Sequence, residues 1–408
     1  MSKEKRRVPK LRFPGFTEDW EQYRFNNLLK INLERNDGKF NSNKTISIAR
    51  MKYNKLGNGA SDESLNNYKV LRFGDVAFEG HENKEFKFGR FVMNDIGDGI
   101  MSPRFTALRP IKVLEVEFWK EYINYEPIMQ KKLVNSTKKG TMMHELVVDE
   151  FLKQEILLPS KVEQQKIGGL LKLQSNIINL HQRKVEHLIL KKKALLQKLF
   201  PRNRNRYPDF RFPGFTDAWE QRKLSEFVDK AVDNRGKTPP LDENGAHPLI
   251  EVAALGGVYP DYSKVEKYLS DDVFNTNLRA YIKKDDILFT TVGSIGLVSL
   301  MDSREEAAIA QNIVAFRAKE NFLPEYLYAL FSNEDNQYKA KRIAMVAVQP
   351  SIKVSQLVNV EYMISTNIEE QERIGVFFSS LQSLITLHQR KLDHLKLQKK
   401  ALLQQMFV

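Results

Sequence analysis

The chain has 408 residues, of which 42% are hydrophobic, and it contains no cysteine. This length predicts two or three domains, because one hydrophobic core rarely extends over so many residues. The lack of cysteine excludes a disulfide scaffold, thiolate chemistry, iron–sulfur clusters and cysteine-ligated zinc, and it favours the reducing cytosol. The first ten residues are basic but no apolar run follows them, so we expect neither a Sec-type signal nor a membrane span.

The formal net charge of +13 is unevenly distributed along the chain. The basic excess lies in the N-terminal arm, one linker and two Leu/Lys-rich stretches, whereas residues 13–162 carry +2 and residues 212–369 carry −6. A sequence pI near 9.4 favours a nucleic-acid partner. If the two large segments bind a phosphate backbone, they must therefore do so through local patches of positive charge.

An internal repeat dominates the sequence. Residues 13–22 read FPGFTEDWEQ and recur at 212–221 as FPGFTDAWEQ, while 163–168 read EQQKIG and recur at 370–375 as EQERIG. The second match continues through LHQRK at 180–184 and 387–391, and through KKALLQ at 192–197 and 399–404. Between these matches, residues 23–162 and 222–369 share almost no identity. A repeated frame with different contents indicates one scaffold that presents two different recognition domains.

The variable segments contain short β-rich runs bounded by Gly, Asn and Asp, for example at 70–78 and 281–289. We expect an α+β fold with internal pseudo-two-fold symmetry. The predicted division is an arm with the first frame motif (1–22), a first recognition domain (23–162), a long helix (163–200), a linker with the second frame motif (201–221), a second recognition domain (222–369) and a second long helix (370–408).

The repeated stretches 163–200 and 370–408 have the heptad pattern of long helices, with polar interruptions at equivalent positions. The predicted apolar seam consists of Ile167, Leu171, Ile178, Val185, Leu188, Leu195, Ile374, Phe378, Ile385, Leu392, Leu395 and Leu402. A helix over 163–200 would be about 57 Å long. We expect the two helices to pair as an antiparallel coiled coil, which is either a plain spacer or a device that sets the distance between two DNA half-sites roughly 34–36 Å apart or a multiple of this.

Two short sequences resemble cofactor or catalytic motifs, but each lacks residues that the motif requires. Residues 234–238, NRGKT, end like a phosphate-binding loop, but Ala231 occupies the place of its first glycine and Pro239 blocks the following helix. Residues 238–241, TPPL, resemble the Pro-Pro turn of amino-methyltransferases but lack its leading Asp or Asn and its closing aromatic residue. The chain is therefore expected neither to bind ATP nor to methylate DNA itself.

The chain has seven histidines, and their spacing argues against a metal site. His181 and His187, like their counterparts His388 and His394, are six residues apart and point to different sides of a helix. One acid/base or metal cluster is plausible, and we favour a solvated charged loop there; it comprises His81 with Glu79, Glu82 and Glu85. The sequence GSIG at 293–296 indicates a tight turn, and the aromatic residues of the two frame motifs are expected to hold each domain to a helix.

The two frame motifs, the run at 285–296 (DDILF…GSIG) and the helix that begins with EQQKI and ends with KKALLQ resemble the specificity subunit of type I restriction–modification enzymes. The resemblance covers essentially the whole chain. It implies two target-recognition domains that each read half of an asymmetric bipartite duplex DNA site, with a spacer set by the paired helices. It also implies two modification subunits, which carry S-adenosylmethionine and methylate adenine N6, and two restriction subunits, which use ATP and Mg²⁺. The subunit itself would be non-catalytic, bind no cofactor or metal, and work in the bacterial or archaeal cytosol.

Candidate DNA-binding residues are basic or hydrogen-bonding side chains in polar surroundings suited to loops, although each is equally compatible with an ordinary surface charge. They are Arg50, Lys52, Asn54, Lys84, Lys87, Arg90 and Arg104 in the first domain, and Arg235, Lys237, Thr238, Ser294, Lys339, Lys341, Arg342, Gln349, Ser351 and Lys353 in the second. The alternative function is a pseudo-dimeric adaptor whose variable domains bind proteins, which the acidic balance of 212–369 favours. A self-contained nuclease or methyltransferase is a weaker option.

Overall fold

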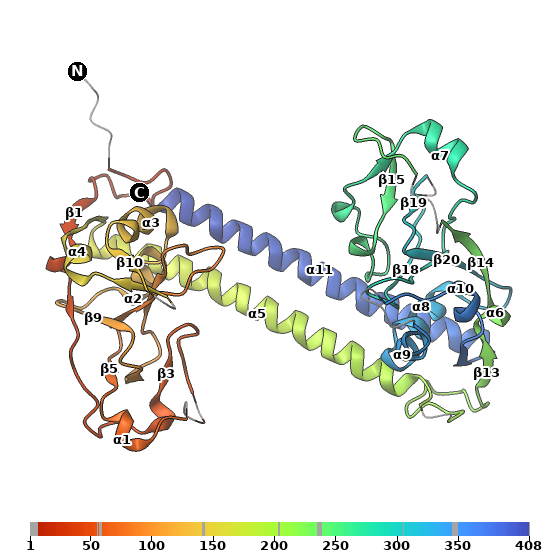
Figure 1. Ribbon diagram of the computed structural model, residues 1–408, viewed down its shortest axis with the longest axis horizontal. Helices are drawn as coiled ribbons and strands as arrows, with labels where there is room; N and C mark the ends of the chain where they lie inside the picture. The colour runs from red at the N-terminus through yellow and green to blue at the C-terminus, as the bar shows by residue number, and fades with distance from the viewer. Residues whose placement is uncertain are drawn as a thin grey trace. The chain divides into compact units, whose positions relative to one another are not determined.

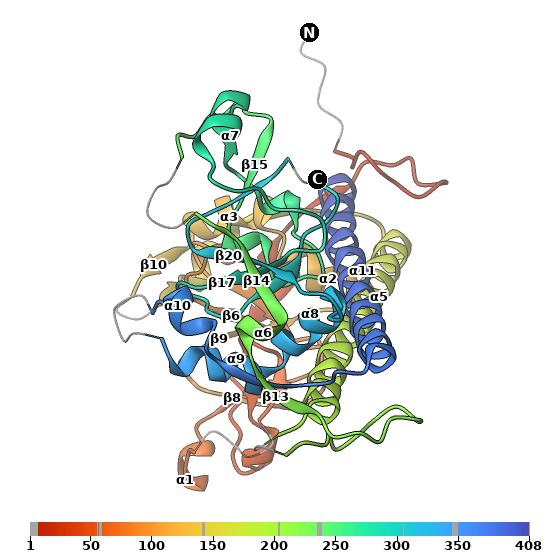
Figure 2. The same cartoon turned by 90° about the vertical axis from the view of Figure 1, so that its right-hand side faces the viewer.

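The computed structural model describes residues 7–54, 56, 59–140, 143–202, 205–234, 239–304, 306–344 and 350–407. Helices and strands are intermixed along the chain, which agrees with the predicted α+β class (Figures 1 and 2). The chain divides into two compact units, Met1–Leu180 with Asp393–Val408 and His181–Leu392. Within the described residues, no helix is long and apolar enough to cross a membrane.

The first unit contains one recognition domain and parts of both long helices. Its strands are β1 (Glu21–Arg24), β2 (Leu29–Ile31), β3 (Ile46–Ser47), β4 (Lys52–Tyr53), β5 (Lys69–Leu71), β6 (Val76–Glu79), β7 (Arg90–Met93), β8 (Gly99–Met101), β9 (Thr106–Pro110), β10 (Thr137–Lys139), β11 (His144–Leu146) and β12 (Glu155–Leu158). Its short helices are α1 (Asp62–Leu65), α2 (Val116–Tyr122), α3 (Glu126–Val134) and α4 (Val148–Lys153).

A four-stranded antiparallel sheet of order β2-β9-β6-β7 forms the centre of this domain. Side chains alternate between the two faces of a strand, so β6 contributes to two hydrophobic cores. Val76 and Phe78 pack with the helices α2, α3 and α4, whereas Ala77 packs with Ile46 of β3 on the other face. The domain is therefore a sheet covered on one side by helices and on the other by small strand pairs.

The second unit contains the other recognition domain. Its strands are β13 (Glu220–Lys223), β14 (Val228–Asp233), β15 (His247–Ile250), β16 (Tyr268–Leu269), β17 (Ile287–Thr290), β18 (Val298–Leu300), β19 (Ala308–Ile309), β20 (Ile313–Ala318) and β21 (Glu361–Ile364). Its short helices are α6 (Leu224–Phe227), α7 (Asp271–Asn277), α8 (Pro324–Ser332), α9 (Glu334–Arg342) and α10 (Val354–Leu357).

The central sheet of the second domain repeats that of the first, with four strands in the order β14-β20-β17-β18. The same ion pair, between an arginine and a buried aspartate, marks the start of the corresponding strand in each sheet. Arg109 donates hydrogen bonds to Asp75 from Nε (3.0 Å) and Nη2 (2.8 Å), and Arg317 donates to Asp286 from the same two nitrogens at 2.8 Å each. Two segments with almost no shared sequence thus have the same sheet order and the same internal anchor.

The long helices α5 (Lys161–Leu199) and α11 (Ile368–Met406) each have 39 residues and contact one another within each unit. In the first unit, Gln174 Nε2 donates to the carbonyl oxygen of Leu395 (3.1 Å). In the second unit, the rings of His181 and His388 lie 5.7 Å apart, and Lys192 Nζ donates to Gln382 Oε1 (2.7 Å). The residue numbers of the partners fall as those of α5 rise, so the two helices run antiparallel in this unit.

The predicted seam residues are buried or half-buried, but they have two different partners. The seam residues near the start of each long helix lie in the core of a recognition domain, with Ile167 and Leu171 in one core and Ile374 and Phe378 in the other. The buried residues Val185, Leu188, Ile385, Leu392 and Leu395 lie further along the helices, together with the half-buried Ile178, Leu195 and Leu402. The heptad pattern alone did not predict this double role, because a period of 3.5 describes the buried stripe and not what covers it.

The last residues of each long helix also enter a domain core. Leu199 and Phe200 pack with Trp219 and Tyr326 in the second unit, and Phe407 contacts Phe118 and Tyr122 in the first. The core of each domain is therefore completed by the beginning of one long helix and the end of the other.

Candidate nucleic-acid interface

Each frame motif is bonded to the first turn of a long helix through a buried carboxylate. Arg12 donates to both oxygens of Glu163 (2.7 and 2.8 Å), and Arg211 donates to both oxygens of Glu370 (2.6 and 2.8 Å). Both glutamates are fully buried. In the second unit, Trp219 also donates from its indole Nε1 to Glu370 (3.1 Å). The Trp219 contact agrees with the role expected of the frame-motif aromatic residues, and the two arginines bond the chain just before each motif to a helix.

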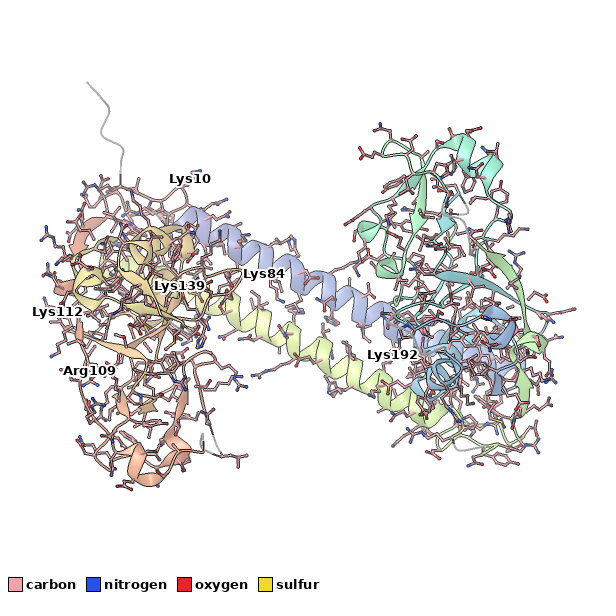
Figure 3. All side chains as sticks on the ribbon, viewed as in Figure 1. Lys10, Lys84, Arg109, Lys112, Lys139 and Lys192 are labelled. Atoms are coloured by element: carbon pink, nitrogen blue, oxygen red, sulfur yellow. The ribbon has the colours of Figure 1, made fainter. Side chains whose placement is uncertain are left out.

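In the first domain, the loop that follows β6 lies against the hairpin formed by β10 and β11. The amide of His144 donates to the carbonyl oxygen of Gly80 (2.8 Å), and a Cβ atom at Gly80 would come within 1.9 Å of the His144 carbonyl oxygen. Lys84 and Lys87 are exposed on this loop, and Lys139 is exposed on the hairpin (Figure 3). Three lysines are therefore available on neighbouring surface segments, of which Lys139 was not among the predicted residues.

The second domain has a corresponding arrangement after β17. The amide of Ile352 donates to the carbonyl oxygen of Thr291 (2.9 Å), and the amide of Gly293 donates to that of Pro350 (2.9 Å). This pairing brings together the predicted residues Ser294 and Ser351, with the exposed Lys353 two residues further on. The glycines of the GSIG sequence have left-handed backbone angles, with φ of 72° at Gly293 and 87° at Gly296, as a tight turn requires.

A second group of candidates surrounds a small surface cavity of about 190 Å³ in the first domain. Asn54 and Arg104 line this cavity. Arg90 supports it from behind, because its Nη2 donates to the carbonyl oxygen of Ala49 (2.7 Å), a lining residue. Arg50 and Lys52 are exposed nearby in the β3–β4 hairpin. Five of the predicted residues thus lie on or beside one concave patch.

The remaining candidates are less favourably placed or cannot be located. Lys341 and Arg342 are exposed in the last turn of α9, whereas Lys339 lies 5.4 Å from the centre of the Tyr362 ring and its pKa is lowered by burial. Lys339 therefore has a packing role, which argues against a phosphate contact. Arg235, Lys237, Thr238 and Gln349 lie outside the described residues.

His81, Glu82 and Glu85 are exposed on a loop, as we favoured, but Glu79 is buried and belongs to a strand. Glu79 is 4% exposed at the end of β6, and its carboxylate contacts His81 Nδ1 (2.6 Å) and Arg90 Nε (3.2 Å). Glu82 instead faces His144 Nε2 (2.8 Å). No group of three or more His, Asp or Glu side chains in the described part of the chain is arranged to hold a metal ion.

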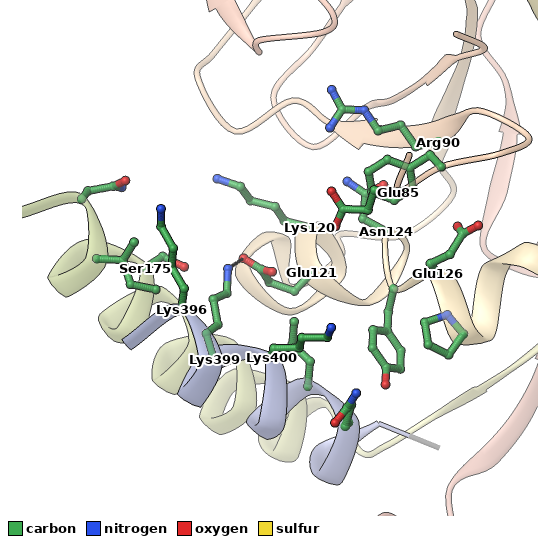
Figure 4. A pocket seen from close by; sticks show the side chains of 17 residues that line it. Glu85, Arg90, Lys120, Glu121, Asn124, Glu126, Ser175, Lys396, Lys399 and Lys400 are labelled. Atoms are coloured by element: carbon green, nitrogen blue, oxygen red, sulfur yellow. Dashed lines mark hydrogen bonds and ion pairs between the residues drawn. The ribbon is translucent and has the colours of Figure 1, made fainter. Parts of the chain in front are cut away.

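The first unit also has an open cleft of about 790 Å³ between α2, α3 and the paired long helices (Figure 4). Lys396, Lys399 and Lys400 of α11 face Lys120 and Glu121 of α2 across it, and Lys399 Nζ lies 2.7 Å from a carboxylate oxygen of Glu121. Both basic and acidic side chains line the cleft, and Lys399 is paired with Glu121.

Several cavity residues could not be found from the sequence. Ser47 is far in sequence from Ser102 and Phe105, which share one turn, and none of the three is part of a recognisable motif. Outside the cavity, His144 is 62 residues from Glu82 in sequence and meets it where the His144 amide bonds to Gly80. Lys138 and Lys139 could have been predicted, because two adjacent lysines followed by a glycine are typical of an exposed basic turn.

Comparison with known proteins finds relatives of one kind. Residues 216–397 match the family model described as type I restriction modification DNA specificity domain. The type I restriction enzyme MjaVIII specificity subunit of Methanocaldococcus jannaschii is 24% identical over 292 residues, which are 69% of this chain and 68% of that protein.

Two solved structures share the fold. The type I restriction–modification S subunit from M. genitalium has a TM-score of 0.63 and 13% identity, over 98% of this chain and 99% of that one. A chain from a structure of a type I R-M system, described for its complex assembly and conformational transition, has a TM-score of 0.52 and 17% identity, over 97% of this chain and 98% of that one. These findings confirm the resemblance seen in the sequence: the chain is similar to the specificity subunits of type I restriction–modification systems.

Proposed function

We propose that the chain binds an asymmetric, bipartite duplex DNA site, with each recognition domain reading one half of it. The observation that carries this proposal is the repeated sheet order and anchoring of two domains whose surface loops differ in sequence. The same sheet order supports the loops of each domain in the same way. The side chains on those loops differ between the domains, so each domain has its own base preference. One polypeptide then reads two different half-sites.

Recognition on this proposal divides into two kinds of contact. Exposed lysines such as Lys84, Lys87 and Lys353 contact phosphates and set the register of the domain on the duplex. Hydrogen-bonding side chains such as Asn54 and Ser351 contact base edges and carry the sequence preference. Substitution can separate the two kinds of contact. Loss of a phosphate contact weakens binding to all sequences, and it lowers by about one the slope of the logarithm of the binding constant against the logarithm of the salt concentration.

We infer that α5 and α11 form an antiparallel coiled coil that sets the spacer between the half-sites and gives the chain an internal pseudo-two-fold axis. The inter-helix contacts within each unit support this inference. The duplicated frame also supports two copies of each partner. The outer face has exposed leucines at equivalent positions of the two helices, Leu180 with Leu387 and Leu190 with Leu397. Such paired apolar sites suit two identical modification subunits.

The chemistry is assigned to the partners. Two modification subunits would supply S-adenosylmethionine and methylate adenine N6, and two restriction subunits would supply ATP hydrolysis with Mg²⁺ and DNA cleavage. The specificity subunit itself directs these activities by selecting the site, and we place the complex in a bacterial or archaeal cytosol. A structural relative comes from a type I R-M system described for its complex assembly, which supports a multisubunit complex.

The test is a map of methylated adenines in cells that express the modification subunits with and without this chain. We expect methylation at two short sequences separated by a fixed number of base pairs, and none of it without the chain. Selection from random duplexes by the purified complex should recover the same bipartite sequence. A complex that assembles but selects no sequence would instead favour the protein-binding adaptor.

A further inference from the structure

His81 in the first recognition domain is held by a buried carboxylate. It lies two residues after the end of β6, and its Nδ1 lies 2.6 Å from Oε1 of Glu79, which is only 4% exposed. The other carboxylate oxygen of Glu79 accepts a hydrogen bond from Arg90 Nε (3.2 Å). Arg90 is fixed in turn by the carbonyl oxygen of Ala49, to which its Nη2 donates (2.7 Å). The imidazole is therefore the outermost member of a chain of three bonded side chains.

This arrangement fixes the tautomer of the imidazole. A carboxylate only accepts hydrogen bonds, and the other oxygen of Glu79 already accepts one from Arg90. Nδ1 must therefore carry the hydrogen, so that the neutral ring presents Nε2 as an acceptor. No hydrogen bond to this Nε2 occurs within the described residues, and the side chain is 52% exposed. By contrast, the Nε2 of His144 and both ring nitrogens of His247 have partners.

The ring also lines the cavity of about 190 Å³ beside the β3–β4 hairpin. The other walls carry hydrogen-bonding side chains, Ser47, Asn54, Ser102 and Arg104, and the ring of Phe105. This combination of a concave surface, several polar groups and one oriented acceptor is typical of a site that distinguishes between ligands by hydrogen bonding.

We propose that His81 is a specificity-determining residue of the first recognition domain. Its Nε2 accepts a hydrogen bond from the exocyclic amino group of an adenine or a cytosine in the major groove. Guanine and thymine present an acceptor oxygen at the corresponding edge, and this oxygen repels Nε2. Glu79 and Arg90 act as positioning residues. This inference rests on the proposed function and deepens it, because it names the chemical group that one part of the first domain reads.

The experiment compares the wild-type complex with the H81N variant, using randomised duplexes and the map of methylated adenines. Asparagine keeps a donor toward Glu79 but removes Nε2. We expect discrimination at a single position of one half-site to fall about 10-fold, the usual scale of one base contact, while the other half-site is unchanged. The matched control is H187N, because His187 is exposed on α5.

The E79Q variant is a second, independent test. The side-chain amide introduced by this substitution can donate to Nδ1 of His81, which allows Nε2 to carry the hydrogen and act as a donor. We therefore expect the preference at the same position to broaden toward guanine or thymine. If H81N does not assemble with the modification subunits, an unchanged preference in E79Q overturns the proposal.

The outcomes separate this inference from the proposed function. A wild-type complex that selects no bipartite site overturns both. A wild-type complex that selects one, with an H81N variant of identical preference, overturns the role of His81 alone. A uniform loss of affinity for all sequences in H81N also overturns it, because a phosphate contact has that effect.

Discussion

Glu163 and Glu370 show how one carboxylate attaches a domain to a helix. Each is fully buried at the start of a long helix and accepts two hydrogen bonds from an arginine that precedes a frame motif. We expect E370Q to lower the free energy of unfolding of the second unit by about 3 kcal/mol, because Arg211 would keep its charge in a buried site without a counterion.

Urea unfolding of the full chain measures this loss. The matched control is E369Q, since Glu369 is the exposed neighbour of Glu370. Equal midpoints for E370Q and E369Q would contradict the prediction.

Lys192 gives a prediction about pH. It donates to Gln382 and lies 5.5 Å from the centre of the Tyr328 ring, and burial lowers its pKa to about 8. The unfolded chain holds this proton up to the ordinary value of 10.5. The free energy of unfolding should therefore increase as the pH rises from about 8 to 10.5, by up to about 3 kcal/mol at 1.36 kcal/mol per pH unit.

The K192M variant tests this assignment. Methionine fills a similar volume without a charge, so the variant should lose this increase between pH 8 and 10.5. K193M is the control, because Lys193 is half-exposed and paired with Glu334. Parallel pH profiles of wild type and K192M would refute the prediction.

The environments of the candidate DNA-binding residues were harder to predict from the sequence than the positions of the frame motifs and long helices. Lys84, Lys87 and Ser294 are exposed on loops as expected, because glycine and polar neighbours indicate loops. Arg90 and Lys339 have the same local signals, yet one is bonded to Glu79 and the other lies over Tyr362. Glu79 lies in the strand paired with that of Arg90, and Tyr362 lies in a strand after α9, so these partners depend on pairing and packing that no local pattern reports.

At the scale of elements, two equivalent glycines allow each long helix to approach a recognition domain. A Cβ atom at Gly168 would lie 2.7 Å from the amide nitrogen of Phe118, and one at Gly375 would lie 2.8 Å from that of Tyr326. We expect G168A to reduce the stability of the first unit by about 2 kcal/mol, since the helix must move away from α2.

The adjacent glycine provides the control for this change. No atom lies within 4 Å of a Cβ atom at Gly169, so G169A should stabilise the same helix by about 0.5–1 kcal/mol. Thermal unfolding of both variants checks the prediction, and a shift of the two midpoints in the same direction would disprove it.

The long helices were the elements most open to prediction. The helix expected at 163–200 is found at Lys161–Leu199, because repeated heptads and flanking prolines mark it clearly. The recognition domains were predicted only as α+β, since their strands are two to six residues long and pair with partners far apart in sequence. Strand order depends on such distant pairings, which one sequence does not specify.

At the scale of the whole molecule, the duplicated leucines on the outer helix faces give a prediction about stoichiometry. The side chains of Leu180 and Leu387 are 68% and 64% exposed. We expect L180E or L387E alone to remove one modification subunit from the complex, and the double variant to remove both, because a buried carboxylate opposes the apolar contact.

Native mass spectrometry of the purified complex counts the bound subunits directly. L173E is the matched control, because Leu173 is 58% exposed but its repeat counterpart is Ser380. A double variant that retains two modification subunits would exclude these leucines from the partner contact.

The completion of each core by the end of a long helix has a consequence for biosynthesis. Met406 and Phe407 belong to the core of the first recognition domain, although nearly all of its other residues lie before position 172. A growing chain therefore leaves the ribosome with its first domain unfinished, and the second domain is translated before the residues that seal the first. Folding in the order of synthesis, usual for multidomain proteins, is reversed at this one step. Chaperones will therefore encounter the nascent first domain while Phe118 and Tyr122, which contact Phe407 in the finished core, are still uncovered.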